Sequence, residues 1–144
     1  MSSPLVSFCI CTYNQENYIS EAIDGAINQN YDNIEIIISD DCSTDNTWKI
    51  INEKIKNTDI KNIILNRNNT NLGLASHVNK IYFELSKGNY VILAAGDDIS
   101  VPLRTKISID FLEKNHQVCA LSSNLDFIDS NSKITPSFTY NSVN

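Results

Sequence analysis

The sequence predicts an α/β fold in which a mostly parallel sheet is flanked by helices. Runs of apolar, β-branched residues alternate along the chain with segments of helical period, which is typical of βα units. The runs are almost continuously apolar, as expected for strands covered on both faces. The 144 residues, 42% hydrophobic and 19% charged, suffice for one domain with a real core. We expect a single domain over residues 1–144, with its core at about 4–130.

Each apolar run is predicted to be a strand because it is rich in branched aliphatic residues and is followed by turn residues. In chain order the five runs are residues 5–11, 34–39, 62–65, 90–94 and 118–122. Beyond the last run the pattern weakens, and we expect the fold to be truncated at its C-terminus.

Between the runs, apolar side chains recur every three or four residues, which predicts four amphipathic helices. Their predicted buried stripes are Tyr18, Ile19, Ala22, Ile23, Ala26 and Ile27; Trp48, Ile51 and Ile55; Leu74, Val78, Ile81, Tyr82 and Leu85; and Leu103, Ile107 and Phe111. Asn30 and Gly88 are predicted to end the first and third helices, and Pro102 to begin the fourth. Residues 43–45 have the composition of a cap before the second helix.

The chain is acidic, with 11 lysines and arginines against 17 aspartates and glutamates, and its net charge is −6. This balance argues against a nucleic-acid partner, which requires a basic face. A phosphate-bearing ligand would need local cations, helix N-termini or a metal to hold it. No apolar stretch approaches the ~20 residues that span a bilayer.

The four cysteines are Cys9, Cys11, Cys42 and Cys119, and the N-terminus has no secretory apolar region. Cys9 and Cys11 lie in a predicted strand and lack the paired spacing of a zinc site, which favours buried free thiols. We therefore expect a reducing, cytoplasmic location.

Polar residues follow three of the predicted strands, at residues 11–14, 40–43 and 96–98. In an open parallel sheet these positions meet at one edge, where ligands bind. Asp97 and Asp98 follow a buried strand, and two adjacent carboxylates there are unfavourable without a nearby cation. Their hard oxygens suit Mn²⁺ or Mg²⁺, so one would hold the metal and the other sugar or ribose hydroxyls. The plain alternative is a solvated acidic turn.

Aromatic and acidic candidates lie on the same edge. The Tyr13 ring could stack on a nucleobase, the alternative being packing against the next helix. Asp41 is a candidate acceptor for a ring N–H of that base. Asp40 points to the other side of the strand and is equally well explained as a helix cap. His77 and His116 are expected to be structural or solvent-facing.

Four ordered segments resemble the nucleotide-diphospho-sugar-binding region of family 2 glycosyltransferases, which have the GT-A fold. They are PLVSFCICTYN at 4–14, SDDCSTD at 39–45, NLGLA at 71–75 with Asn79, and GNYVILAAGDD at 88–98. The chain departs from the family pattern at three positions. Cys11 replaces a frequent proline, Val78 a frequent arginine, and Ala95 the first aspartate of a longer acidic motif.

The resemblance implies a role for each residue of the edge. Tyr13 would stack on the base and Asp41 would bind it, while Cys11 and Glu16 would lie in the donor site. Asp98 would bind the metal, and Asp97 the donor sugar or the ribose.

The resemblance also implies the reaction. A metal-dependent, inverting glycosyltransferase would move a sugar from a UDP-linked donor to a saccharide or lipid-linked acceptor, in polysaccharide or glycolipid synthesis. We expect it in the cytoplasm, in peripheral contact with the inner face of the membrane. The general base would be a carboxylate further along the chain, because Asp126 and Asp129 stand too early to supply it.

Three other functions compete with this one. A catalytically incomplete nucleotide-sugar-binding module stays open as the alternative. A sugar-phosphate nucleotidyltransferase would need a glycine-rich, basic first loop, and residues 12–16 are neither. A phospho-acceptor receiver domain would carry its acidic pair after the first strand rather than after the fourth.

Overall fold

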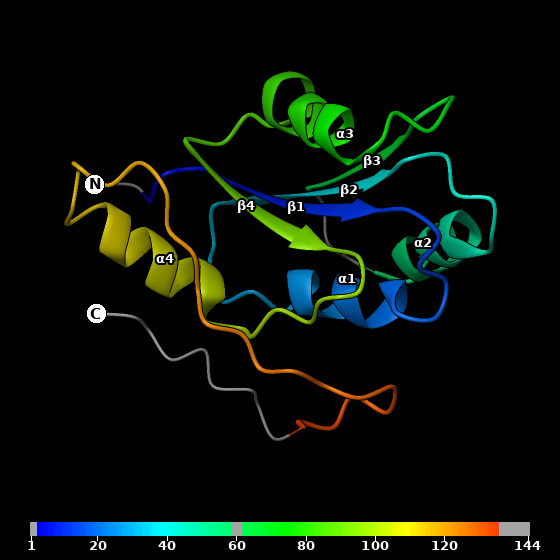
Figure 1. Ribbon diagram of the computed structural model, residues 1–144. Coiled ribbons are helices and arrows are strands. Elements are labelled where there is room, and N and C mark those ends of the chain that lie inside the picture. The colour runs from blue at the N-terminus through cyan, green and yellow to red at the C-terminus, as the bar shows by residue number, and fades with distance from the viewer. Residues whose placement is uncertain (1–2, 59–61, 136–144) are drawn as a thin grey trace.

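The computed structural model describes residues 3–58 and 62–135 and has an α/β architecture (Figure 1). Its elements are β1 (Val6–Thr12), α1 (Ile19–Ile27), β2 (Ile34–Asp40), α2 (Thr47–Lys56), β3 (Ile63–Arg67), α3 (Leu74–Lys80), the π-helical turn η1 (Ile81–Leu85), β4 (Tyr90–Ala95) and α4 (Arg104–Leu112). Four of the five predicted strands are confirmed, with ends that shift by one or two residues.

The four strands form one parallel sheet in the order β3-β2-β1-β4. β1 is therefore central, and nearly all of its residues and those of β2 are buried, as their continuous apolar runs predicted. The register sets Thr12 opposite Asp40, and Cys11 opposite Ala95. The carboxyl ends of β2, β1 and β4 are consequently level with one another.

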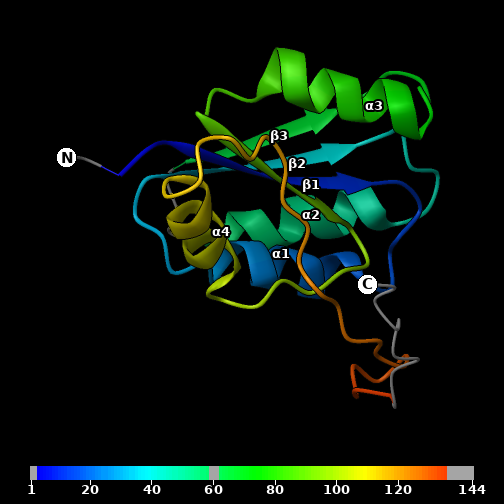
Figure 2. The same cartoon turned by 60° about the vertical axis from the view of Figure 1, so that its left-hand side comes forward.

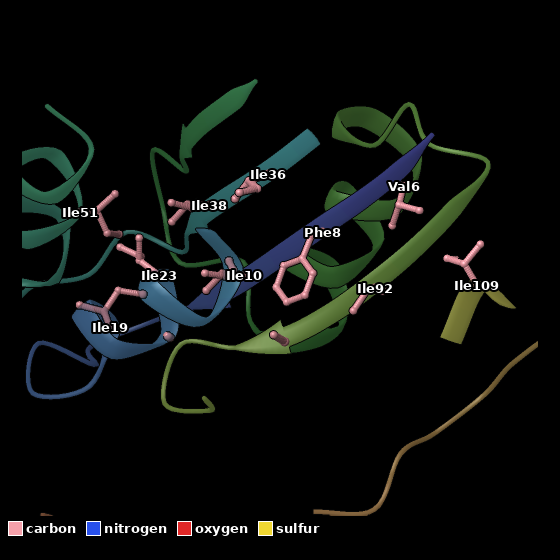
Figure 3. Close-up of a cluster of buried hydrophobic side chains, with 13 residues drawn as sticks. Val6, Phe8, Ile10, Ile19, Ile23, Ile36, Ile38, Ile51, Ile92 and Ile109 are labelled. Carbon is pink, nitrogen blue, oxygen red and sulfur yellow. The ribbon is translucent and has the colours of Figure 1, made fainter. Parts of the chain in front are cut away.

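Helices cover both faces of the sheet. α3 lies on one face, and α1, α2 and α4 lie on the other (Figures 1 and 2). The larger core forms on the second face, where Phe8 and Ile10 of β1 meet Ile23 of α1 and Ile51 of α2 (Figure 3). Each such aliphatic or aromatic side chain contributes about 1.5–3 kcal/mol on burial, so this face holds most of the stabilising contacts. A smaller cluster of Cys9, Ile37 and Ile81 lies under α3 and η1.

The predicted strand at residues 118–122 is wrong. This segment has no strand pairing among residues 3–58 and 62–135, and most of it is exposed. A strand needs a neighbour that accepts its backbone hydrogen bonds, and the segment instead runs past α4, away from the sheet (Figure 1). Further on, residues 129–133 form a turn that is closed by the bond from the Asp129 backbone N–H to Lys133 O and by an isolated antiparallel bridge between Ile128 and Ile134.

The apolar stripe predicted for the fourth helix is also wrong. Ile107 is 61% exposed, and Leu103 and Phe111 are exposed as well, whereas Thr105 and Ile109 are buried. Thr105 fixes the orientation of the helix, because its backbone N–H and hydroxyl both donate to Gln29 Oε1, at 3.0 and 2.7 Å.

The third helix differs from its prediction in part. Leu74 and Tyr82 are exposed, whereas Ile81 is buried as predicted and His77, outside the predicted stripe, is buried as well. The first helix ends at Ile27 rather than near Asn30, the third helical segment ends at Leu85 before Gly88, and α4 begins two residues after Pro102. None of the helices in the part of the chain described here is long and apolar enough to cross a membrane.

Candidate functional site

The site lies where the strand order reverses. The chain runs from β1 outward through β2 and β3, and then returns to the other side of β1 as β4. In open α/β sheets such a reversal marks the edge at which ligands bind, outside the carboxyl ends of the strands. Residues 13–18, 41–46 and 96–103 follow β1, β2 and β4 at this edge, and we call the space outside them the crevice.

The first two loops are joined by hydrogen bonds. The backbone N–H of Asp41 donates to Thr12 O at 2.9 Å, and that of Asn14 donates to Ser43 Oγ at 2.9 Å. Asn14 Oδ1 in turn accepts from the Thr44 backbone N–H at 2.8 Å. Asn14 has a φ of 52°, a conformation that asparagine tolerates better than most residues. These bonds fix the backbone on either side of Tyr13, whose ring is 42% exposed at the edge.

Asp41 is almost fully buried beneath the loop that precedes α3. Its Oδ1 accepts from Asn68 Nδ2 at 2.8 Å and from the Leu72 backbone N–H at 2.9 Å, and its Oδ2 accepts from the Gly73 backbone N–H at 2.9 Å. Burial alone would raise the pKa of Asp41, but the bonds from Leu72 and Asn68 outweigh it, so that the pKa lies below its usual value. Asp41 is thus ionised at neutral pH, and Oδ2 keeps one acceptor position.

Asp40 serves the loop rather than the crevice. It is fully buried, accepts hydrogen bonds from the backbone N–H and hydroxyl of Ser43, and pairs with Arg67 Nε at 3.2 Å. Asp40 therefore closes the turn after β2 and is a turn residue rather than the helix cap that we had considered, because α2 begins only at Thr47, after Asn46.

Glu16 lies at the same edge and contacts the start of α2. Its Oε2 accepts from the backbone N–H and side-chain amide of Asn46, at 2.8 and 2.7 Å. In the opposite direction, Asp45 Oδ2 accepts a hydrogen bond from the Glu16 backbone N–H at 3.1 Å, and Asp45 Oδ1 accepts one from the Thr47 backbone N–H at 2.9 Å. The N-cap of α2 is Asn46, one residue after the predicted cap at 43–45, and Asp45 and Glu16 bond the backbone N–H groups of Thr47 and Asn46 at the start of the helix.

Asp97 and Asp98 project from the loop after β4. Both are exposed, and no donor among residues 3–58 and 62–135 reaches either carboxylate. The loop lies against β1, because a Cβ on Gly96 would come within 2.5 Å of Thr12 Oγ1 and 2.4 Å of Gln15 Oε1. A side chain at Gly96 would displace these groups, so glycine lets the acidic pair begin beside Thr12 and Gln15.

The acidic pair suits a divalent metal that also binds a ligand. The part of the chain that the structure describes holds no group of three or more His, Cys, Asp or Glu side chains able to bind a metal ion alone. Mg²⁺ and similar ions are commonly held by one or two carboxylates together with substrate phosphates. Two carboxylates with uncommitted oxygens, next to a crevice, fit that kind of site.

His77 contacts Cys11 close to the carboxyl edge of the sheet, an interaction that the sequence did not suggest. His77 Nδ1 is 3.2 Å from Cys11 Sγ, and His77 Nε2 is 2.6 Å from Ser39 Oγ. Ser39 Oγ also accepts from Asn66 Nδ2 at 2.8 Å, so the ring of His77 is held between the serine hydroxyl and the sulfur. Burial raises the pKa of the Cys11 thiol to about 11 and lowers the pKa of His77, so both groups are neutral.

The expectation of structural histidines fits the positions that both occupy. His77 is fully buried between α3 and the sheet, and His116 is exposed. The signal in the sequence was the spacing of His77 four residues before Ile81, which places the two on one helix face. All four cysteines are free; Cys9 is buried and Cys11 half-buried, as the strand position of this pair predicted, whereas Cys119 is exposed.

A parallel sheet with polar loops at its switch point is the architecture of nucleotide-binding α/β proteins. Within that class the chain belongs to glycosyl transferase family 2, whose family model matches residues 7–142. The fold is that of GT-A glycosyltransferases, as the resemblance implied.

Two relatives illustrate the family. An uncharacterized glycosyltransferase of Haemophilus influenzae is 40% identical over 125 residues, which are 87% of this chain and 38% of that protein. The UDP-Glc:alpha-D-GlcNAc-diphosphoundecaprenol beta-1,3-glucosyltransferase WfaP of Escherichia coli is 41% identical over 109 residues, 76% of this chain and 41% of that protein. The chain thus spans less than half the length of these relatives.

Two solved structures are similar as well. S. aureus TarS 1-349 in complex with UDP-GlcNAc has a TM-score of 0.67 and 28% identity, over 78% of this chain and 32% of that one. The mannosyltransferase PcManGT from Pyrobaculum calidifontis, solved with GDP-Man and Mn²⁺, has a TM-score of 0.62 over 67% of this chain and 28% of that one. At 23% identity the second supports the fold alone.

Proposed function

We propose that this chain forms the donor-binding part of a glycosyltransferase that uses a UDP-linked sugar. The observation that carries the proposal is that Tyr13, Asp41 and the Asp97-Asp98 pair follow β1, β2 and β4, whose carboxyl ends are level at the switch point of a family 2 fold. The uridine diphosphate is inferred from the relatives: WfaP is named for UDP-Glc, and TarS was solved with UDP-GlcNAc.

The nucleoside would bind at the β1–β2 side of the crevice. The half-exposed Tyr13 ring offers a flat face for the base, worth about 1–3 kcal/mol by stacking. Asp41 would accept the ring N–H through the remaining acceptor position of Oδ2, after a small movement of the Leu72–Gly73 backbone that now covers it. Cys11 and Glu16 would border the same pocket, Cys11 through its backbone.

The diphosphate would lie toward β4. Asp98 would hold a Mn²⁺ or Mg²⁺ ion together with diphosphate oxygens, while Asp97 would accept hydrogen bonds from hydroxyls of the sugar or the ribose. A bound divalent ion would offset the negative charge on the leaving diphosphate. The chain itself is acidic, which makes such an ion the simplest means of attracting a diphosphate.

The acceptor side of the reaction is inferred from the family. We propose transfer with inversion to a saccharide or lipid-linked acceptor, as the name of WfaP suggests, at the inner face of the membrane. A carboxylate outside the segments that build the donor crevice would deprotonate the attacking hydroxyl. Asp126 and Asp129 are exposed, and Asp129 Oδ1 is engaged by the backbone N–H groups of Asn131 and Lys133.

Titration calorimetry with UDP, in Mn²⁺ and again in EDTA, tests the donor site. We expect Mn²⁺ to tighten binding at least about tenfold, and Asp98→Ala to bring the affinity down to the EDTA level. Tyr13→Ala should weaken binding about 5- to 150-fold in both conditions, because stacking does not involve the metal. Asp110→Ala, which removes an exposed acid on α4, is the matched control.

Absence of UDP binding by the unmodified protein, in Mn²⁺ as well as in EDTA, would refute the proposal. Incubation with UDP-glucose or UDP-GlcNAc and a lipid-linked saccharide then separates the two remaining functions. Transfer identifies an active glycosyltransferase, whereas binding without transfer identifies a nucleotide-sugar-binding module.

A further inference from the structure

The loop that carries the acidic pair is fixed at both ends by backbone contacts. At its start the Gly96 backbone N–H donates to Cys11 O at 3.0 Å, and the Asp98 N–H donates to Ala95 O at 3.2 Å. At its end, Val101 O accepts from Gln29 Nε2 at 2.9 Å, and Pro102 O accepts from the Asn30 N–H at 2.8 Å. The loop is therefore held between β1 and the end of α1.

The middle of the loop is held by Arg104, the first residue of α4. Its Nη1 donates to Ser100 Oγ at 2.8 Å, and its Nη2 donates to Leu93 O in β4 at 2.9 Å. The guanidinium also lies over the Phe8 ring, 5.9 Å from its centroid. One rigid, planar group thus joins the loop to the strand that precedes it.

The packing around Ser100 leaves little room for another arrangement. Ser100 is buried, and a Cβ on Gly25 of α1 would come within 2.8 Å of the Ser100 backbone N. A loop confined by α1 on one side and by Arg104 on the other has one accessible backbone path. Asp97 and Asp98 lie on that path shortly before Ser100, and both are exposed.

We propose that Arg104 is a positioning residue for the donor site, which sets the direction of the Asp97 and Asp98 carboxylates by bridging Ser100 and Leu93. The inference rests on the proposed function of the acidic pair. It assigns to Arg104 a role distinct from ligand contact, because both of its described hydrogen bonds go to the protein.

A positioning role and a purely electrostatic role of Arg104 predict opposite effects on metal-dependent UDP binding when the side chain is removed. The positive charge of Arg104 acts on Asp98 and opposes a divalent cation bound there. Removal of that charge alone would tighten metal-dependent binding. If the positioning effect of Arg104 is larger than the effect of its charge, removal of the guanidinium weakens metal-dependent UDP binding. Groups that orient metal ligands typically change metal affinity by about 10- to 100-fold. The sign of the change therefore separates the two roles.

The test compares Arg104→Gln with Lys106→Gln by calorimetry with UDP in Mn²⁺ and in EDTA. Both variants remove one positive charge from α4, but within residues 3–58 and 62–135 the Lys106 side chain bonds to the exposed Asp110 alone. We expect Arg104→Gln to weaken UDP binding about tenfold in Mn²⁺ and less than about twofold in EDTA. Lys106→Gln should stay within about twofold of the unmodified protein in both conditions.

Ser100→Ala provides a second variant that keeps every charge and removes only the loop-side acceptor. We expect Ser100→Ala to weaken UDP binding less than Arg104→Gln does, and in Mn²⁺ alone. The double variant should bind UDP within about twofold of Arg104→Gln, because both changes break the same Arg104–Ser100 bond. Hydrogen exchange of the peptide over residues 96–101 should be faster in both single variants than in Lys106→Gln.

The outcomes are distinguishable from one another. Tighter UDP binding in Mn²⁺ by Arg104→Gln, or unchanged binding together with unchanged exchange of residues 96–101, would overturn the positioning role. A protein that binds no UDP at all would refute the proposed function instead, and the exchange rates would then decide by themselves whether Arg104 fixes the loop.

Discussion

Asp40 and Asp41 are neighbours in the sequence, yet they act in different places. Because successive side chains of a strand point to opposite faces, Asp40 turns inward to Ser43 and Arg67, while Asp41 turns toward the loop before α3. The alternation itself was predictable from the sequence. The bonds of Asp41 to Leu72 and Gly73 were not, because those donors lie about thirty residues further along the chain.

Replacement of Asp41 by asparagine should lower the free energy of unfolding at pH 7 by about 1–3 kcal/mol, since one oxygen that accepts a backbone N–H is lost. The pKa of Asp41 in the folded protein lies below its reference value of 3.8, so the ionised carboxylate stabilises the fold above that pH. This contribution is lost as the pH falls below about 3.8 toward the folded pKa.

Urea unfolding of the unmodified protein and of Asp41→Asn, at pH 7 and near pH 3, measures this effect. The difference in the free energy of unfolding between the two proteins should be smaller at the lower pH, where Asp41 begins to be protonated in both the folded and unfolded states. Asp110→Asn serves as the control for loss of an exposed carboxylate. A difference in the free energy of unfolding that is the same at both pH values would show that the charge of Asp41 does not stabilise the loop.

Cys11 and His77 resemble a nucleophile and its base, but their environment predicts low reactivity. With a pKa of about 11, only about 0.1% of Cys11 is thiolate at pH 8, and the thiolate is the species that reacts. Iodoacetamide at pH 8, followed by mass spectrometry of the peptides, should label the exposed Cys119 well before Cys11. Faster labelling of Cys11 would instead indicate a thiolate paired with a protonated His77.

At the scale of elements, α4 shows why hydrophobic spacing alone can select the wrong face. Its regular apolar stripe is the exposed one, and the buried face is defined by a threonine and one isoleucine. The orientation follows from two hydrogen bonds between Thr105 and Gln29, a partner on α1 that a local pattern cannot reveal. The first two helices follow their predicted stripes more closely, because those stripes face the wide core beneath the sheet.

Two isoleucines on α4 give a matched test of this orientation. Ile109→Ala should lower the free energy of unfolding by about 2–4 kcal/mol, because Ile109 is only 3% exposed and a cavity would remain. Ile107→Ala should change it by less than about 0.5 kcal/mol, because Ile107 is largely exposed. Chemical unfolding measures both values. Equal losses, or a larger loss for Ile107, would mean that α4 packs through its apolar stripe.

For the molecule as a whole, the sheet and the edge that carries the candidate site could be predicted from the sequence. Continuous apolar runs specify buried parallel strands, and the residues after each run then belong to one edge. The prediction of a fifth strand was wrong because an apolar run forms a strand only when a neighbouring strand bonds to its backbone. Residues 118–122 have no such neighbour among the described segments. The contacts of Arg104 and Gln29 could not be predicted, because they depend on how separate helices dock.

The strand order also determines when the crevice can come into existence during synthesis. β1, at the start of the chain, completes its pairing only when β4 arrives and sets Tyr90 beside Val6. Such distant pairing forms slowly, because a long loop must close before its contacts can compensate for the lost entropy. A nascent chain that ends before β4 exposes an unpaired edge of β1, a site at which chains aggregate. The proposed donor site is consequently completed only after β4 has paired, and donor binding would report that the central strand has acquired both of its neighbours.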